Sequence, residues 1–130
     1  MREIKFRGKN IRKRFIYGYL IKIDENYFII DDSIKKAKEP IKVKYQTVGQ
    51  YTGVLDMDGV ESYDGDVISD GDCNYFIKYE DGRYLAVMVY DDGAIEKFNL
   101  EAIIAYCKVV GNIHDNPDIF DLKDDSESKN

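Results

Sequence analysis

Apolar and polar side chains alternate over short stretches in the first 46 residues, which is the period of a half-buried β-strand. Ile4 and Phe6 alternate with charged neighbours, and the basic segment 9–14 then has the character of a turn. Further stretches with this strand pattern lie at residues 15–23, 27–30 and 41–45, and residues 24–26 suit a hairpin turn between the first two. Residues 31–40 are polar and end in proline, which predicts a loop with room for one helical turn capped by Asp32 or Ser33.

The second half of the chain contains five Asp-Gly pairs, which start at residues 58, 64, 70, 81 and 92. Because Gly adopts positive φ freely and Asp tolerates it, this pair is typical of tight turns. Stretches rich in β-forming residues lie between the pairs, at residues 66–69, 74–79, 84–90 and 94–98. Residues 99–104 are too few for a stable helix and predict a single helical turn, followed by a last strand at 107–112.

Four strands, a helical turn and a fifth strand follow one another in the order of a small SH3-like barrel. We therefore predict a mainly β protein with a β-rich N-terminal part at residues 1–46, a connecting segment at 47–59 and an SH3-like small barrel at 60–118. Residues 119–130 are mostly polar and predict a disordered acidic tail.

The composition indicates a folded chain without a membrane segment. The 130 residues are 44% hydrophobic, with eleven Tyr and six Phe, which suits one domain or two very small ones. The longest nearly apolar run, residues 15–23, includes Lys22 and is far shorter than the roughly 20 residues that span a bilayer. Two cysteines 34 positions apart make neither a disulfide framework nor a zinc site. The first residues lack the apolar stretch of a signal peptide, so a reducing cytoplasm is expected.

The net charge of −6 is unevenly distributed along the chain, with a basic first part and an acidic second part. Residues 1–44 carry thirteen Lys or Arg against six Asp or Glu, which gives +7. Residues 45–130 carry six basic against nineteen acidic residues, which gives −13. Such an asymmetry indicates either a half that faces nucleic acid or two surfaces that attract each other.

Three ordered motifs lie in the middle of the chain: Thr-Val-Gly-Gln-Tyr-Thr-Gly at 47–53, Asp-Met-Asp-Gly at 56–59 and Ser-Tyr-Asp-Gly-Asp-Val-Ile at 62–68. They closely resemble the YopX family of phage and prophage proteins from low-GC Gram-positive bacteria, and the resemblance extends to residues 1–7 and 110–117. Ser62 stands where family members usually carry an aliphatic residue, and Asp64 where Glu is common. The resemblance implies a β-rich N-terminal part, an SH3-like barrel and a bacterial host cytoplasm. It implies no activity and no catalytic residues.

Glycines and tyrosines are prominent in these motifs, and two other polar residues accompany them. The motif residues are Gly49, Gln50, Tyr51, Gly53, Tyr63, Gly65 and Asp66. Glycines next to aromatic residues usually serve turns and packing, so we expect a structural role. The alternative is a loop that contacts a ligand through exposed tyrosines.

Candidate catalytic and metal-binding groups are few. The acidic run at 64–72 fails the EF-hand pattern in both registers, because Tyr75 falls where the pattern needs Gly and Ile68 where it needs an oxygen ligand. The only thiols and the only imidazole are those of Cys73, Cys107 and His114, and nothing in their spacing pairs them for nucleophilic catalysis. We expect no enzymatic activity, no cofactor and no bound metal.

Two functional hypotheses follow. The first is a non-enzymatic, self-associating binding or assembly module, a homo-oligomer in which a basic N-terminal face meets an acidic C-terminal face. The alternative is a nucleic-acid-binding accessory protein, because clustered cations release counterions from phosphate and neighbouring rings stack on unpaired bases. The candidate contact residues for such a partner are Arg7, Lys9, Arg12, Lys13 and Arg14.

Overall fold

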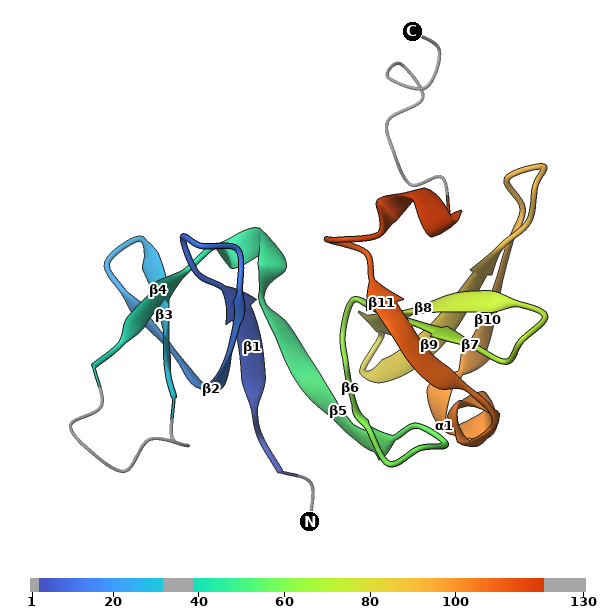
Figure 1. Ribbon diagram of the computed structural model, residues 1–130, viewed down its shortest axis with the longest axis horizontal. Coiled ribbons are helices and arrows are strands. Elements are labelled where there is room, and N and C mark those ends of the chain that lie inside the picture. Colours follow the sequence, from blue (N-terminus) through green and yellow to red (C-terminus); the bar gives the residue numbers. More distant parts are fainter. Residues whose placement is uncertain (1–2, 32–38, 121–130) are drawn as a thin grey trace, which may run out of the picture. The chain divides into compact units, whose positions relative to one another are not determined.

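The computed structural model describes residues 3–31 and 39–120, and the chain divides into two compact units, Met1–Gly53 and Val54–Asn130 (Figure 1). The division falls within the segment 47–59 that the sequence marks as a connection. The helical turn considered at Asp32 or Ser33, and the tail from residue 121 onward, lie outside the described residues.

The first unit holds the first five strands of an antiparallel sheet whose order is β4-β3-β2-β1-β5-β6. Alternation predicts strands where β1 to β4 lie, whereas β5 lies in the segment predicted as a connection. The elements of this unit are β1 (Phe6–Lys9), β2 (Phe15–Ile23), β3 (Asn26–Ile30), β4 (Ile41–Val43), the 3-10 helix η1 (Tyr45–Thr47) and β5 (Gly49–Leu55). The strand predicted at 41–45 is wrong for its last two residues, because Tyr45 begins η1. The Thr47 hydroxyl fixes this turn by donating to the Lys44 carbonyl (2.6 Å) and accepting from the Lys9 N–H (2.8 Å).

Two glycines let the strands of the first unit approach closely around Ile29 and Val43, which are 0% and 4% exposed. Gly18 in β2 has a φ of +154°, and a Cβ there would lie 1.9 Å from the Ile30 carbonyl oxygen. A Cβ on Gly8 in β1 would lie 2.9 Å from the Val43 Cβ. Both positions therefore require glycine, since any side chain would collide with a neighbouring strand.

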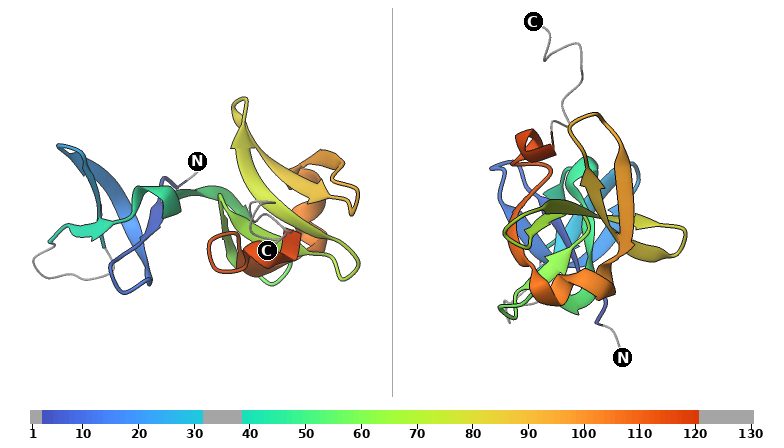
Figure 2. Two further views of the ribbon diagram at one scale, coloured as in Figure 1. Left: turned by 90° about the horizontal axis from the view of Figure 1, so that it is seen from above. Right: turned by 90° about the vertical axis from the view of Figure 1, so that its right-hand side faces the viewer.

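The second unit begins with the end of β5, from Val54, and the Ser62 hydroxyl of β6 donates a hydrogen bond to the Val54 carbonyl at 2.9 Å. Its remaining strands form an antiparallel sheet in the order β10-β9-β8-β7-β11 (Figure 2). The elements are β6 (Glu61–Tyr63), β7 (Asp66–Ser69), β8 (Asn74–Glu80), β9 (Arg83–Val89), β10 (Ile95–Asn99), α1 (Leu100–Ile103), the 3-10 helix η2 (Ile104–Tyr106), β11 (Lys108–Asn112) and the 3-10 helix η3 (Pro117–Phe120).

Turns at Asp-Gly pairs connect β7, β8, β9 and β10, as the sequence predicts. Gly71, Gly82 and Gly93 all have positive φ, at +100°, +83° and +88°. The predicted helical turn is confirmed as α1 followed by η2, and it places Leu100 and Ile104 in the core. The core cluster consists of Ile68, Tyr75, Ile77, Ala86, Leu100, Ile104 and Cys107.

The predicted order of elements in the second unit is confirmed, since β11 returns to pair with β7 after the helical turn. Closure into an SH3-like barrel is not confirmed, because β10 and β11 are the two edges of an open sheet within the described residues. Of the tail predicted at 119–130, only residues 119 and 120 are described, and they belong to η3. In residues 3–31 and 39–120, no helix is long and apolar enough to cross a membrane.

Candidate binding surface

The five basic residues selected from the sequence occupy two different environments. Arg7 lies in β1 and is only 4% exposed, with its guanidinium carbon 4.2 Å from the centre of the Phe15 ring. The Lys9 ammonium lies 5.2 Å from the centre of the same ring. Such cation–π contacts stabilise the pairing of β1 with β2 by about 0.5–2 kcal/mol each. The structure thus places Arg7 in the interior, and it does not bring Arg7 together with the three cations of the following turn.

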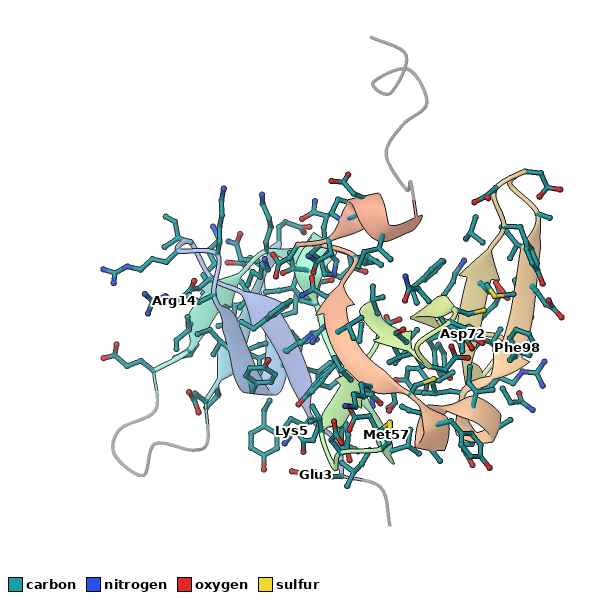
Figure 3. All side chains as sticks on the ribbon, turned by 45° about the vertical axis from the view of Figure 1, so that its right-hand side comes forward. Glu3, Lys5, Arg14, Met57, Asp72 and Phe98 are labelled. Carbon is teal, nitrogen blue, oxygen red and sulfur yellow. The ribbon has the colours of Figure 1, made fainter. Side chains whose placement is uncertain are left out.

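Those three cations, Arg12, Lys13 and Arg14, are exposed on the turn between β1 and β2. The Asn10 side chain holds the turn, because its Oδ1 accepts hydrogen bonds from the backbone N–H groups of Arg12 and Arg14, both at 3.0 Å. Lys13 takes a positive φ of +63° at the tip. Figure 3 labels Arg14, which extends from this turn. No ion pair joins these three cations to an acidic side chain in the part of the chain that the structure describes.

A second group of residues lies next to this turn, around η1. The Lys44 N–H donates to the Lys9 carbonyl at 2.9 Å, which fixes the start of η1 beside the start of the turn. Tyr45 is 60% exposed and stacks on Tyr27, with ring centres 4.5 Å apart and planes 29° apart. The Lys22 ammonium lies 5.6 Å from the centre of the Tyr27 ring. We refer to Arg12, Lys13, Arg14 and Lys44, together with Tyr45 stacked on Tyr27, as the basic end of the first unit.

Sequence reasoning missed the contribution of Tyr45, because alternation assigned it to a strand. The one local signal is Thr47, a residue whose hydroxyl competes with the backbone for hydrogen bonds and so favours turns. Here that hydroxyl binds the Lys44 carbonyl and turns Tyr45 outward in η1.

Residues 49–53, from the first of the three sequence motifs, lie in β5 and serve packing. Gly49 and Gln50 pair with Arg7 and Phe6 of β1. Tyr51 is 8% exposed, and the Lys5 ammonium lies 5.6 Å from the centre of its ring. Gly53 has a φ of +90°, a conformation that favours glycine.

Asp56 fixes the turn formed by the second motif through its side-chain carboxylate, a role that its place among many acidic residues did not indicate. Its Oδ1 accepts hydrogen bonds from the N–H groups of Asp58 (2.8 Å) and Val60 (2.9 Å), and its Oδ2 accepts one from Val109 in β11 (2.8 Å). Burial raises the pKa of this carboxyl, but the three N–H donors and the nearby Lys108 outweigh it and hold the pKa below the ordinary value of 3.8. The carboxylate therefore joins the turn at 56–60 to β11.

The third motif forms the turn between β6 and β7. Asp66 is 2% exposed, and its Oδ2 accepts a hydrogen bond from the Tyr63 N–H at 2.7 Å. Gly65 has a φ of +93° and donates its N–H to the Ile77 carbonyl at 2.8 Å. The Tyr63 ring is 2% exposed and its hydroxyl donates to Glu61 at 3.1 Å, so the ring is not available to a ligand.

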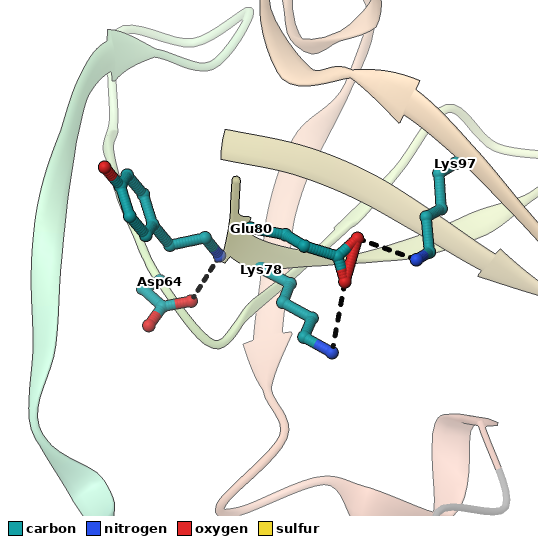
Figure 4. A network of polar contacts seen from close by, with 5 residues as sticks. Asp64, Lys78, Glu80 and Lys97 are labelled. Carbon is teal, nitrogen blue, oxygen red and sulfur yellow. Dashed lines mark hydrogen bonds and ion pairs between the residues drawn. The ribbon is translucent and has the colours of Figure 1, made fainter. Parts of the chain in front are cut away.

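Side chains of the acidic run also bind the protein's own backbone. The Asp64 carboxylate accepts a hydrogen bond from the Tyr79 N–H at 3.3 Å. Next to Tyr79, Glu80 forms ion pairs with Lys97 (2.7 Å) and Lys78 (3.7 Å) (Figure 4). Asp70 accepts from the N–H groups of Cys73 and Asp72, which lower the pKa of its carboxyl. In residues 3–31 and 39–120, no three His, Cys, Asp or Glu side chains are grouped so that they could hold a metal ion.

The two thiols differ in burial, and the backbone of His114 belongs to a turn. Burial raises the pKa of the Cys107 thiol to about 11, so this thiol is protonated near neutral pH. Cys73 is half-buried. The His114 backbone N–H donates to the Asn112 side chain at 3.0 Å, as does that of Asp115 at 2.9 Å, which makes residues 112–115 a closed turn after β11.

Comparison with known proteins places the chain among small β proteins of one family. Residues 5–121 match the family described as YopX protein, and the chain belongs to this family, as the motifs indicate. The crystal structure of protein EF1440 from Enterococcus faecalis is similar, with a TM-score of 0.60 over 92% of this chain and 99% of that one. At 22% identity, this similarity shows the fold alone. No curated protein matches the sequence.

Proposed function

We propose that the protein is a non-enzymatic binding module that self-associates, with the basic first unit of one copy contacting the acidic second unit of another. The observation that carries this proposal is that the charge division coincides with the structural division. Met1–Gly53 carries thirteen basic and six acidic residues, and Val54–Asn130 carries six basic and nineteen acidic ones. Complementary charges of this size accelerate the encounter of two copies and determine how their surfaces align.

Further features support this proposal. A contact between two different surfaces of identical chains is heterologous, and it closes into a ring when the rotation between subunits permits. The element order of the second unit, four strands, a helical turn and a strand returning to β7, supports an SH3-like arrangement for it. Family membership supports a setting in a bacterium that carries a phage or prophage, and the free thiols of Cys73 and Cys107 are compatible with its cytoplasm.

Light scattering coupled to size exclusion tests self-association. We expect an oligomer at about 50 mM salt that dissociates at about 1 M salt, where the Debye length falls to roughly 3 Å. Replacing Arg12, Lys13 and Arg14 by Ser is expected to weaken the oligomer. The matched control replaces three basic residues of the second unit by Ser, namely Lys78, Arg83 and Lys108. This triple variant changes the net charge by the same amount. A monomer under both salt conditions would contradict the proposal.

Nucleic-acid binding is the second candidate function, and the three exposed cations on the β1–β2 turn favour it. Gel shifts with single- and double-stranded DNA and RNA test this candidate at about 50 mM salt, where phosphate contacts are strongest. We expect a shift that the Ser variant of Arg12, Lys13 and Arg14 loses. Absence of any shift would remove this candidate and leave self-association untouched.

A further inference from the structure

Tyr45 is an exposed aromatic ring held in a fixed orientation. One face of its ring stacks on Tyr27, while the side chain remains 60% exposed. Its backbone is fixed in η1, where the Tyr45 carbonyl accepts a hydrogen bond from the Val48 N–H at 3.0 Å. A ring that is already ordered loses little conformational entropy when a planar group stacks on its outer face.

One cation precedes this ring in the sequence, and a backbone hydrogen bond connects the same segment to the strand that leads into the cationic turn. Lys44 directly precedes Tyr45, and its N–H bonds the carbonyl of Lys9, the last residue before the turn that carries Arg12–Arg14. That turn is closed by the hydrogen bond from the Asn10 N–H to the Arg14 carbonyl at 2.9 Å. An ordered exposed ring next to several cations without acidic partners is the combination that single-stranded nucleic acid requires, namely a stacking platform and phosphate contacts.

We infer that the basic end of the first unit binds single-stranded nucleic acid, with an unpaired base stacked on Tyr45 and phosphates at Arg12, Lys13, Arg14 and Lys44. This inference rests on the second candidate function and specifies its ligand. A base reaches the ring only when it is unpaired, whereas the cations contact phosphates of single and double strands alike. The stacking residue therefore distinguishes the two kinds of ligand.

Fluorescence anisotropy with a labelled single strand and the duplex of the same sequence tests this assignment. Replacing Tyr45 by Ser is expected to weaken single-strand binding by about 5- to 150-fold, which corresponds to about 1–3 kcal/mol for one stacked base. Duplex binding is expected to stay unchanged. Tyr45→Phe retains the ring and is expected to retain the affinity, which separates stacking from a folding defect. Tyr106→Ser is the matched control, since Tyr106 is 72% exposed but lies in the second unit.

The salt dependence tests the cations independently. Replacing Arg12, Lys13 and Arg14 by Ser is expected to reduce the slope of log K against log salt by about 2 for a single strand. Arg83→Ser, an exposed position of the second unit, is expected to leave the slope unchanged. Single-strand binding that Tyr45→Ser leaves intact would overturn this inference while the candidate function stands. Absence of binding to any of the nucleic acids would overturn both.

Discussion

The Asp56 carboxylate accepts a hydrogen bond from the backbone N–H of Val109, 53 residues further along the chain, at 2.8 Å. The same carboxylate accepts the N–H groups of Asp58 and Val60, so one side chain holds both its own turn and β11. Lys108, next to Val109, adds an ion pair with Asp58 at 3.8 Å. Asp56 therefore links the segment that enters the second unit to the strand that completes its sheet.

Asp56→Ala is expected to lower the free energy of unfolding by about 2–4 kcal/mol, because it leaves three backbone donors without their acceptor. Urea denaturation followed by circular dichroism measures this loss. Asp58→Ala is the control, because it removes only the exposed ion pair with Lys108, worth about 0–1 kcal/mol. Equal losses in the two variants would show that the Asp56 hydrogen bonds contribute nothing beyond surface charge.

The stability of the protein is expected to fall in acid in a way that depends on Asp56. The pKa of this carboxyl is lower in the folded chain than its ordinary value of 3.8, so the folded state favours the ionised form. The resulting stabilisation is complete above pH of about 5, and it is lost as the pH falls through the lowered pKa. Urea midpoints measured from pH 7 downward are expected to converge for the native chain and Asp56→Asn. A constant gap down to pH of about 2 would contradict the assignment.

Gly18→Ala is expected to destabilise the first unit by about 2–5 kcal/mol, from backbone strain and from the collision of the new methyl group with the Ile30 carbonyl. Gly59→Ala is the matched control, because Gly59 also has a positive φ, of +80°, but no atom lies within 4 Å of the added Cβ. It is expected to cost only the strain, about 1–2 kcal/mol. Thermal unfolding of both variants measures the difference, and a Gly18→Ala chain as stable as Gly59→Ala would refute the close approach of β2 to β3.

A thiol reagent such as DTNB is expected to modify one cysteine of the folded protein at pH of about 8. Cys107 is 1% exposed and burial raises its pKa to about 11, so it is expected to react only as the protein unfolds. Cys73 is half-buried and supplies the reactive thiol. The Cys73→Ser variant is therefore expected to show no fast phase, and a persistent fast phase would show that Cys107 is accessible.

Local patterns predicted much of this fold, because the forces that define strands and tight turns act between near neighbours. Alternation located β2 and β3, and the Asp-Gly pairs located the turns at Gly71, Gly82 and Gly93. The shortness of the segment 99–104 predicts the single helical turn that α1 and η2 form. Closure of the barrel was not confirmed, since it depends on how distant strands curve.

Features set by contacts between distant residues were not visible in the sequence. Arg7 is one charge in a basic run, and only the pairing of β1 with β2 places it over Phe15. Tyr45 continues an alternating pattern, but it begins η1, where the Thr47 hydroxyl binds both the Lys44 carbonyl and the N–H of the distant Lys9. For the same reason, Asp56 could not be separated from the many acidic residues of the second half.

The strand β5 has a consequence for the order in which the chain is made. The described registers of the pairs β1–β2, β1–β5, β2–β3 and β3–β4 join residues up to position 50, and the first unit ends at Gly53. Both strands of each of these four pairs are therefore synthesised before the second unit is complete, whereas β7 cannot form its pair with β11 until the chain reaches Lys108. Since domains generally fold as units during synthesis, the strand pairs of the basic unit can form while the acidic unit is still being made.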